Sequence, residues 1–462
     1  MSARGAPCSL LGDSGAMIDP PDEPETPLAR KRNPLYEFAT ETKAKRRRTA
    51  FFSPKRETAN LKTLSAIVLS FILVAGLAGA SLPARAQDTI KIGEINSYSA
   101  IPSFTEPYRQ GWRLALDEIN AGGGVDGKKL EVISKDDGGK PADAVTAANE
   151  LVASDGVVML MGTYFSNVGL AVSDFAKQKK ILFLAAEPLT DAITLSKGNR
   201  YTFRLRPGTY EQASMLADEA AKLPAKKWAT IAPNYEYGQS AVTAFKALLS
   251  AKRPDIQWVG EQWPPQGKID AGAVVEAIAR TEPEAIFNVT FGPDLVKLVR
   301  EGGTRGLFKD RAVVSLLSGE PEYLDPLKDE TPQGWIVTGY PWADVAIPDH
   351  AAFLKAYQAK YGDYPRLGSV VGYSALKAAA AILAKAHATD SERLVDAAEG
   401  VGVETPFGPI TFRAVDHQST FGAFVGKTAL KDGKGVMIDF AYHDGGKYLP
   451  SEAEVKAQRP QN

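Results

Sequence analysis

The chain of 462 residues contains a single cysteine, Cys8. Residues 87–462 contain none, so this part of the chain can form no disulfide, no thiol nucleophile and no cysteine-ligated metal site. The four histidines are scattered, and none stands at a spacing typical of a metal-ligand pair: His350, His387, His417 and His443. The sequence therefore predicts a large body held by its hydrophobic core, without metal or other cofactor.

Features of catalysis and nucleotide binding are also missing. The glycine run Gly122–Gly124 follows a helical pattern in which Trp112, Leu116 and Ile119 share one apolar face. A phosphate cradle needs its glycines before a helix, where N–H groups point at the anion. Here the end of the helix exposes carbonyls, so the glycines are expected to cap it. No G-x-S-x-G turn with suitable partners precedes a helix.

Charge is uneven along the chain. Residues 1–86 contain 13 Lys/Arg and 8 Asp/Glu, a net charge of +5, which leaves 41 and 47 and a net charge of −6 for residues 87–462. A mildly acidic body argues against a nucleic-acid partner. The pair Asp136-Asp137 follows a predicted strand and suggests a metal or acid–base site, but a solvated turn is the interpretation we favour.

Long apolar runs are scarce, and one stands near the N-terminus. Leu64–Gly79 carries no charge but has 16 residues, fewer than the ~20 that span a bilayer. Small residues at Ala84 and Ala86 suit a signal peptidase, so residues 61–86 are predicted to be a signal peptide cut after Ala86. A retained membrane anchor is the alternative. Because no cysteine follows the run, a lipoprotein anchor is excluded, and we expect export to the periplasm.

Residues 1–60 are polar, rich in proline and basic in blocks, a composition that cannot bury a core. We expect a disordered extension or a start codon assigned too early, since LKTLSAIVLS from Leu61 resembles the beginning of a signal peptide. A nucleic-acid or nuclear tail and twin-arginine export are the alternatives for the basic blocks.

The body alternates strand-like apolar runs with amphipathic helices in two series. Each helix is long enough for a crossover, which predicts mainly parallel sheets with helices on both faces. The segment Arg204–Thr209, RLRPGT, separates the series, and the chain is expected to cross again near 334–340 and 410–416. In the first series we predict strands at 89–95, 129–133, 157–161 and 181–185 and helices at 107–120, 141–153 and 166–177. In the second series we predict strands at 228–232, 257–261, 285–289 and 313–317 and helices at 237–250, 271–280 and 293–301. In the tail we predict helices at 350–361 and 369–387 and strands at 421–427 and 436–442.

Several short motifs carry a resemblance to a known family when their order and spacing are taken together. They are IKIGEI, GWRLALDEINAGGGVDGKKLEV, DDGGKP, LMGTYFSN, ILFLAAEPLT, NYEYG, SGEPEY and FGPITF, and they extend over residues 88–445. In the order and spacing of these motifs, the chain resembles the periplasmic solute-binding proteins of the branched-chain amino acid (Leu/Ile/Val) ABC transporter family.

The resemblance implies the type I periplasmic binding protein fold. This is an α/β fold of two Rossmann-like lobes, with parallel sheets flanked by helices and three crossover hinge strands. Lobe 1 is expected at 88–206 plus 340–412, lobe 2 at 207–337 plus 416–445, and a C-terminal tail at 446–462. The family closes like a jaw on one small-molecule ligand, without cofactor or catalysis, and presents it to an inner-membrane ABC permease; a monomer is expected.

The resemblance also implies ligand-binding residues. An amino acid carboxylate suits hydroxyls and N–H groups at a helix N-terminus, and Ser166 matches the family's carboxylate-binding serine, with an ordinary N-cap as the alternative. Glu320 resembles the family's ammonium partner, or is a solvated loop carboxylate. Tyr237 and Phe104 match aromatic wall positions, or pack in the core. The remaining candidates lie in two loops: Thr163, Tyr164, Asn167, Ala185, Ala186 and Glu187.

Two departures put the ligand in question. Glu187 and Pro188 replace the family's small residues and threonine, so Glu187 binds an ammonium or indicates a different ligand. The family's disulfide between the D-D turn and the serine loop is replaced by Gly139 and Phe165. The added bulk of Phe165 and Tyr164 near the ligand carboxylate points to an aromatic ligand, or to one that is not an amino acid at all. The class of ligand that we expect is an amino acid or an aromatic or aliphatic carboxylate.

Three functions follow from these patterns. The first is the periplasmic binding component of an ABC importer. The second is a sensory module on the same fold that hands its ligand to a receptor or regulator. The third, a secreted hydrolase, lacks a nucleophile and base and is disfavoured.

Overall fold

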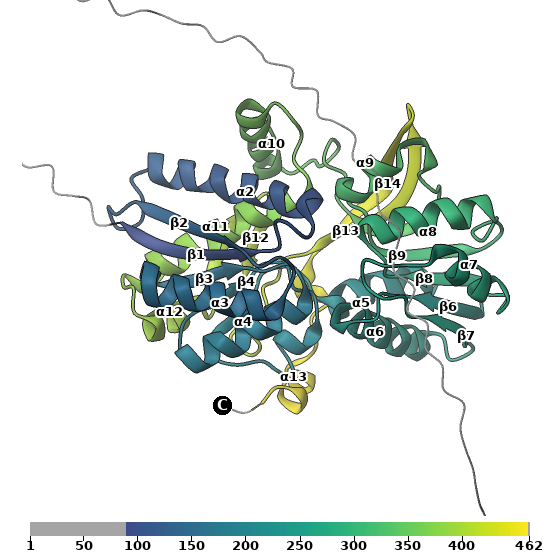
Figure 1. Cartoon of the computed structure of the whole chain (residues 1–462), viewed down its shortest axis with the longest axis horizontal. Helices are drawn as coiled ribbons and strands as arrows, with labels where there is room; N and C mark the ends of the chain where they lie inside the picture. The colour runs from purple at the N-terminus through teal and green to yellow at the C-terminus, as the bar shows by residue number, and fades with distance from the viewer. Residues whose placement is uncertain (1–88, 461–462) are drawn as a thin grey trace, which may run out of the picture. The chain divides into compact units, whose positions relative to one another are not determined.

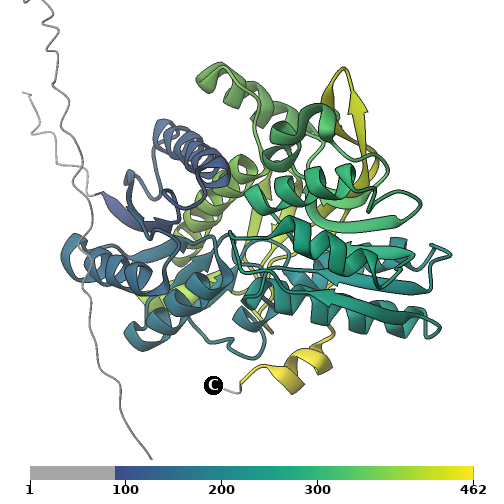
Figure 2. The same ribbon diagram turned by 45° about the vertical axis from the view of Figure 1, so that its right-hand side comes forward.

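The computed structural model describes residues 89–460. The predicted signal peptide and the extension before it lie outside the described residues. Within that range the chain forms two α/β lobes, each built on one sheet with helices on both of its faces (Figures 1 and 2).

The sheet of the first lobe has five parallel strands in the order β2-β1-β3-β4-β5. Its strands are β1 (Ile90–Asn96), β2 (Leu130–Asp136), β3 (Met159–Gly162), β4 (Phe183–Ala185) and β5 (Thr202–Arg204). Its helices are α2 (Pro102–Ala121), α3 (Pro141–Glu150), α4 (Ser166–Lys179), α10 (Pro348–Tyr361), α11 (Leu367–Ala386) and α12 (Ser391–Ala398), and a hairpin of β11 (Gly402–Thr405) and β12 (Gly408–Thr411) accompanies them.

The sheet of the second lobe has seven strands in the order β14-β13-β10-β9-β8-β6-β7. Its strands are β6 (Lys227–Ile231), β7 (Gln257–Gln262), β8 (Ala285–Asn288), β9 (Ala312–Gly319), β10 (Ile336–Gly339), β13 (Ala423–Lys431) and β14 (Lys434–His443). Its helices are α5 (Thr209–Ala220), α6 (Glu236–Lys252), α7 (Ala271–Ala279), α8 (Gly292–Thr304) and α9 (Pro321–Leu327), and α13 (Glu452–Gln458) follows near the C-terminus. Strands β6 to β10 are parallel, whereas β13 and β14 are antiparallel.

Helix α2 ends as its sequence predicts. Gly123 and Gly124 adopt positive φ angles of 103° and 78°, and the Gly124 N–H donates to the Ile119 carbonyl at 2.9 Å. Glycine adopts this conformation without the steric cost of a side chain. The predicted capping role of the glycine run is confirmed.

The start of α2 differs from the sequence-based prediction. The helix begins at Pro102 and contains Pro107, whereas we expected Pro107 to start it. Proline is well suited to the first turn, and Pro102 takes that position. The helix therefore begins five residues earlier than predicted.

Helices α2 and α11 pack at very short range. A Cβ on Gly111 would lie 2.0 Å from the Ser369 carbonyl oxygen, and one on Gly372 would lie 2.0 Å from that of Tyr108. Glycine is required at both contacts. In residues 89–460, α11 is the one helix long and apolar enough to cross a membrane, and 72% of its most apolar window is buried inside the protein.

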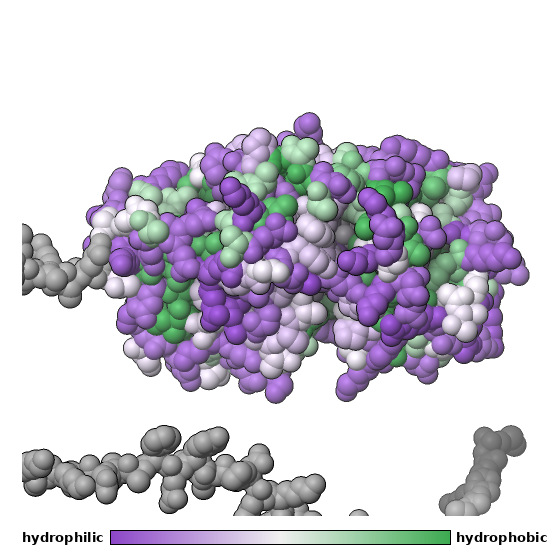
Figure 3. Space-filling view, turned by 90° about the horizontal axis from the view of Figure 1, so that it is seen from above, coloured by the Kyte–Doolittle hydropathy of each residue, from purple (hydrophilic) through white to green (hydrophobic). Residues whose placement is uncertain are grey.

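Each sheet is covered by apolar side chains. In the second lobe, Phe245 stacks on Phe287 with ring centroids 3.8 Å apart, and Trp228 lies 5.8 Å from Phe245. On the face seen in Figure 3, hydrophilic residues predominate and hydrophobic patches are small.

Candidate functional site

Arg206 joins the two lobes at the centre of a buried cleft. It lies between β5 and α5, and its side chain is only 5% exposed. Nη2 donates to Glu320 Oε1 at 2.6 Å and Nη1 to Glu187 Oε2 at 3.3 Å. Glu187 follows β4 in the first lobe, and Glu320 precedes α9 in the second. One guanidinium therefore bridges carboxylates from opposite lobes.

The charge of this triad is unbalanced, because one guanidinium cannot neutralise two carboxylates. Burial raises the pKa of Glu187 to about 8; Arg206 opposes this shift, and the charge of Glu320 adds to it. Burial likewise raises the pKa of Glu320 to about 8, again opposed by Arg206. Burial acts to lower the pKa of Arg206, but the two glutamates raise it overall. Each carboxyl group therefore keeps its proton to a higher pH than an exposed glutamate does.

Aromatic rings enclose the triad. Tyr237 and Phe291 pack edge to face with ring centroids 5.6 Å apart, and Tyr164 lies 6.2 Å from Phe291. The remaining cavity is only about 20 Å³, little more than one water needs. Its lining residues are Tyr164, Ser166, Glu187, Leu189, Arg206, Tyr235, Tyr237, Phe291 and Leu317. In this structure the side chains that line the cleft therefore fill almost all of it.

Several buried polar atoms in the cleft have no hydrogen-bond partner. They include the second oxygen of each glutamate, Glu187 Oε1 and Glu320 Oε2, and the Tyr237 hydroxyl. Leaving a buried acceptor unpaired costs about 1–3 kcal/mol. These unpaired atoms lower the stability of the closed cleft unless a bound solute or water forms hydrogen bonds with them.

Ser166 lines the cavity as the first residue of α4. The alternative that it is an ordinary N-cap is wrong, because Phe165 holds that position and no side chain caps the helix. Instead, Ser166 Oγ accepts a hydrogen bond from the Thr190 N–H at 3.2 Å. The hydroxyl proton can then be donated towards the cavity.

The other predicted site residues surround the cavity at different depths. Phe104 is fully buried, with its ring centroid 5.0 Å from that of Tyr164 and 5.5 Å from the Arg206 guanidinium carbon. Thr163 is buried with a positive φ of 60° and an unpaired hydroxyl. Asn167 is half-buried, and its Oδ1 atom is unpaired. All three remain predictions as ligand contacts.

Ala185 and Ala186 are fully buried and act in the structure through their backbone. The Ala185 carbonyl accepts from the Leu205 N–H at 2.9 Å, and the Ala186 N–H donates to the Gly162 carbonyl at 3.0 Å. These bonds fix the loop that carries Glu187 against the first crossover. Neither alanine lines the cavity.

Sequence reasoning missed five cavity residues. They are Leu189, Arg206, Tyr235, Phe291 and Leu317. The charged pair in RLRPGT was a usable signal for Arg206, because two arginines in a short connection after a buried strand need partners. Nothing local in the sequence marks Leu317 or Phe291.

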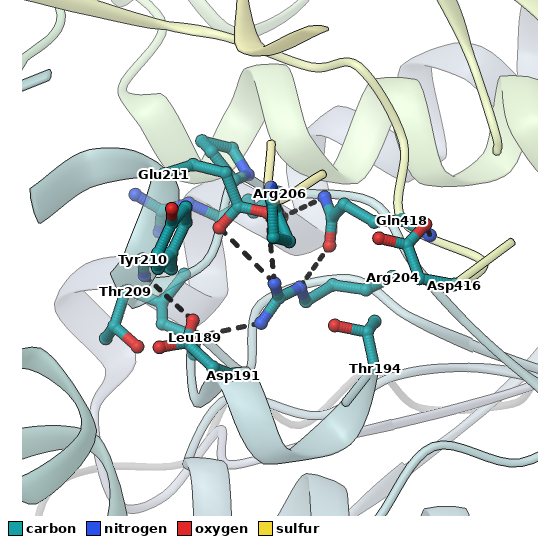
Figure 4. Close-up of polar contacts among 12 residues, drawn as sticks. Leu189, Asp191, Thr194, Arg204, Arg206, Thr209, Tyr210, Glu211, Asp416 and Gln418 are labelled. Atoms are coloured by element: carbon teal, nitrogen blue, oxygen red, sulfur yellow. Dashed lines mark hydrogen bonds and ion pairs between the residues drawn. The ribbon is translucent and has the colours of Figure 1, made fainter. Parts of the chain in front are cut away.

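A second buried arginine, Arg204, ties the crossovers together (Figure 4). Its Nη1 donates to the Thr190 carbonyl at 2.7 Å, and Nη2 lies 3.4 Å from Glu211 Oε1 at the start of α5. Nε donates to the side-chain oxygen of Gln418, which lies in the third crossover. Gln418 in turn donates to the Arg206 carbonyl at 3.0 Å. Arg206, which bridges the lobes, is therefore held in place by Gln418 of the third crossover.

Gly139 and Phe165 are neighbours in space, as the resemblance implies for the family's disulfide positions. A Cβ on Gly139 would lie 3.0 Å from Phe165 Cε2. In this chain the contact is made by an aromatic ring instead of a covalent bond.

Two α/β lobes joined by three crossovers around a buried polar cleft define the type I periplasmic binding protein fold. A family model described as "Periplasmic binding protein" matches residues 89–434. The chain belongs to this family, whose members bind solutes and are not enzymes, so the family predicted from the sequence motifs is confirmed. Among residues 89–460, no group of three or more His, Cys, Asp or Glu residues could hold a metal ion.

Known relatives bind different solutes. The chain is 26% identical over 346 residues to "Amino acid binding protein" of Pseudomonas aeruginosa, which covers 73% of this chain and 89% of that protein. It is 25% identical over 345 residues to the "Leucine-, isoleucine-, valine-, threonine-, and alanine-binding protein" of the same organism, with the same coverage. A solute-binding protein of an ABC transporter from Rhodopseudomonas palustris BisB5, solved with 3,4-dihydroxybenzoic acid, has a TM-score of 0.70 and 25% identity, and the match covers 77% of this chain and 98% of that chain.

Proposed function

We propose that this chain is the substrate-binding component of an ABC importer. It captures an amino acid or a related small carboxylate in the cleft and delivers it to an inner-membrane permease. The observation that carries the proposal is the Arg206 bridge, since one buried residue contacts carboxylates of both lobes. A solute that contacts the same groups would stabilise the closed arrangement and shift the population towards it.

The rest of the cleft supports a solute with a carboxylate. The Ser166 hydroxyl, at the start of α4, faces the cavity beside the positive end of the helix dipole. Asn167, Thr163 and Tyr164 belong to the same loop and helix start and complete the proposed contact region, with Ala185 and Ala186 behind it. Relatives named for amino acids, and a neighbour solved with an aromatic acid, bind solutes of this chemistry.

The proposed place of action is the periplasm, which the protein reaches as a monomer after removal of residues 61–86. Mass spectrometry of the protein secreted by its own host tests the cleavage, and a mature N-terminus after Ala86 is expected. Recovery of the uncleaved chain in the membrane fraction would favour the retained anchor.

A thermal-shift screen of amino acids, aromatic acids and short aliphatic acids tests the binding function. A true solute at about 100 times its dissociation constant adds about 2.7 kcal/mol to the free energy of unfolding. Uptake of the same solute by cells with and without the gene separates an importer from a sensory module. Loss of uptake in the deletion strain is expected; unchanged uptake with unchanged binding would favour the sensor.

A further inference from the structure

After its three crossovers, the chain passes between the lobes once more near the C-terminus. Following β14 of the second lobe, residues 445–460 return along the hinge to the first lobe, and they contain α13. In Figures 1 and 2, α13 lies at the lower edge of the molecule, below the junction of the lobes. We call residues 445–460 the strap. Its contacts reach both lobes and the third crossover.

The start of the strap is seated on the second lobe. A Cβ on Gly445 would lie 2.1 Å from the Phe421 carbonyl oxygen, so the backbone of the strap runs directly against the end of the third crossover, where β13 begins. The Tyr448 hydroxyl lies 2.7 Å from Nδ1 of His443, the last residue of β14. This end of the strap therefore moves with the sheet of the second lobe.

The far end of the strap is held by the guanidinium of Arg459. In the first lobe, Nη1 donates to the Thr194 carbonyl at 2.6 Å and Nη2 donates to the Asn199 carbonyl at 2.9 Å. In the third crossover, Nη1 donates to the Asp416 carbonyl at 2.9 Å, and Nη2 lies 3.2 Å from His417 Nδ1. One side chain therefore fastens the strap to the first lobe and to a crossover together.

The guanidinium fits its seat closely, whereas the rest of α13 packs loosely. A Cβ on Gly198 would lie 2.3 Å from Arg459 Nη1, so glycine leaves the space that the guanidinium needs. Within α13, Val455 is the one buried side chain. A cavity of about 360 Å³ remains between the strap, the first lobe and the third crossover. Because few contacts hold this end of the strap, one substitution can release it.

The segment of the first lobe that Arg459 holds also touches the second lobe, a few residues earlier in the chain. Thr190 Oγ1 donates to Glu236 Oε1, at the start of α6, at 2.8 Å. The next residue, Asp191, accepts from the Ser240 hydroxyl of α6 at 3.1 Å. These contacts join the two lobes in the closed arrangement. The strap therefore fastens the part of the first lobe that meets the second.

We infer that the strap restrains the opening of the two lobes, with Arg459 as the positioning residue that fastens it. Because its ends are held on opposite lobes, α13 has to unfold or Arg459 has to leave its seat when the lobes separate. Hydrogen bonds that form in the closed arrangement raise the closed population, and the apparent affinity for a solute rises with that population. This restraint acts at the hinge and is independent of which solute binds.

Pulsed electron paramagnetic resonance on the full-length chain without solute measures the opening. Spin labels on Ala142→Cys at the start of α3 and on Lys268→Cys between β7 and α7 report the distance between the lobes. Both positions are exposed, and Cys8→Ser removes the natural cysteine. In this background Arg459→Met is expected to shift the distances to longer values and to lower the ratio of closed to open molecules about tenfold. Identical distance distributions with and without Arg459→Met would overturn the inference.

Two further variants separate the latch from a general effect on α13. Lys456→Met removes one positive charge from the same helix, where Lys456 pairs with Glu452 at the surface, and is expected to keep the distances of the parent. A shift as large as that of Arg459→Met would contradict the role of Arg459.

Gly198→Ala crowds the guanidinium from the other side and keeps its charge. The same shift to longer distances is expected, so this variant decides the matter if circular dichroism shows that Arg459→Met does not fold. Distances equal to those of the parent in a folded Gly198→Ala would then overturn the inference. Neither outcome bears on solute binding, which the thermal-shift screen tests separately.

Discussion

The hydroxyl oxygens of Tyr164 and Tyr323 lie 3.2 Å apart, although 159 residues separate them in the chain. Tyr164 precedes α4 in the first lobe, and Tyr323 belongs to α9 in the second. Two further contacts of α9 reach the first lobe: Glu322 accepts from the Gly368 N–H at 2.7 Å, and Asp325 pairs with Arg366 at 3.2 Å. These contacts join the lobes together with the Arg206 bridge and the aromatic rings of the cleft, and each polar contact can be removed singly.

Tyr323→Phe and Tyr164→Phe remove one hydroxyl each from the contact between the lobes. Each change is expected to weaken solute binding modestly, because a hydrogen bond between neutral groups contributes about 0.5–1.5 kcal/mol. A double-mutant cycle on the dissociation constants measures the coupling. Strictly additive effects would show that the two hydroxyls do not meet in the solute-bound state.

Glu320→Gln removes the charge but retains an oxygen that can accept from Arg206. The affinity for an amino acid is expected to fall at least tenfold, about 1.4 kcal/mol, while the melting temperature of the solute-free protein falls less than in Arg204→Met, because the amide oxygen and Glu187 still accept from Arg206. Calorimetry and thermal denaturation measure the two quantities. The control is Glu330→Gln, which changes the same charge at the surface, where Glu330 pairs with Arg300. Equal affinities of Glu320→Gln and the parent would remove Glu320 from the site.

Two of the raised pKa values that make stability depend on pH belong to glutamates of the cleft; Glu94, Glu211 and Glu322 are also raised by burial and titrate alike in the parent and in Glu320→Gln. Glu187 and Glu320 have pKa values of about 8 when folded, above the ordinary 4.5. Between these values the folded state keeps protons that the unfolded state has released, so their contribution to stability is full below pH 4.5 and is lost as the pH rises through 8. The free energy of unfolding is expected to fall over this window, and less steeply in Glu320→Gln. Urea titrations at several pH values measure the slopes, and identical slopes would contradict the raised pKa of Glu320.

Arg204→Met tests how much the buried contacts of Arg204 between the crossovers contribute to the free energy of unfolding. The substitution leaves Glu211 as a buried carboxylate without its cation and frees the Leu189 and Thr190 carbonyls. Breaking a buried pair in this way typically costs about 3–5 kcal/mol of stability.

Arg200→Met is the matched control for the hinge, because Arg200 forms exposed ion pairs with Glu392 and Asp396. Such pairs contribute about 0–1 kcal/mol, so urea denaturation should show a small effect here and a large one at Arg204. A similar loss of stability in both variants would contradict the structural role assigned to Arg204.

Much of the fold could be predicted from the periodicity of the sequence. Helix α4 begins at Ser166 as expected, and β1, β7 and β8 lie within one residue of their predicted bounds. These elements have local signals, namely alternating apolar runs and helix starts, that depend little on distant contacts. Helix α5 was missed because RLRPGT was interpreted as a connection and the polar start of the helix after it has a weak pattern.

The site was predicted only where a motif marked it. Ser166, Tyr164, Glu187 and Tyr237 were proposed from the resemblance, and they line one cavity. Arg206 was not proposed, because its partner Glu320 lies 114 residues further along the chain. The charged pair in RLRPGT indicates that these arginines need partners, but nothing local in the sequence shows which residue of the second lobe Arg206 contacts.

A crystal structure of the protein with its solute bound tests the central claim most directly. We predict a solute between the lobes that contacts Ser166 from the first lobe and Glu320 from the second, with its chemical structure unaltered. A solute bound elsewhere, or an unchanged Arg206 bridge with nothing beside it in crystals grown with saturating solute, would contradict the account.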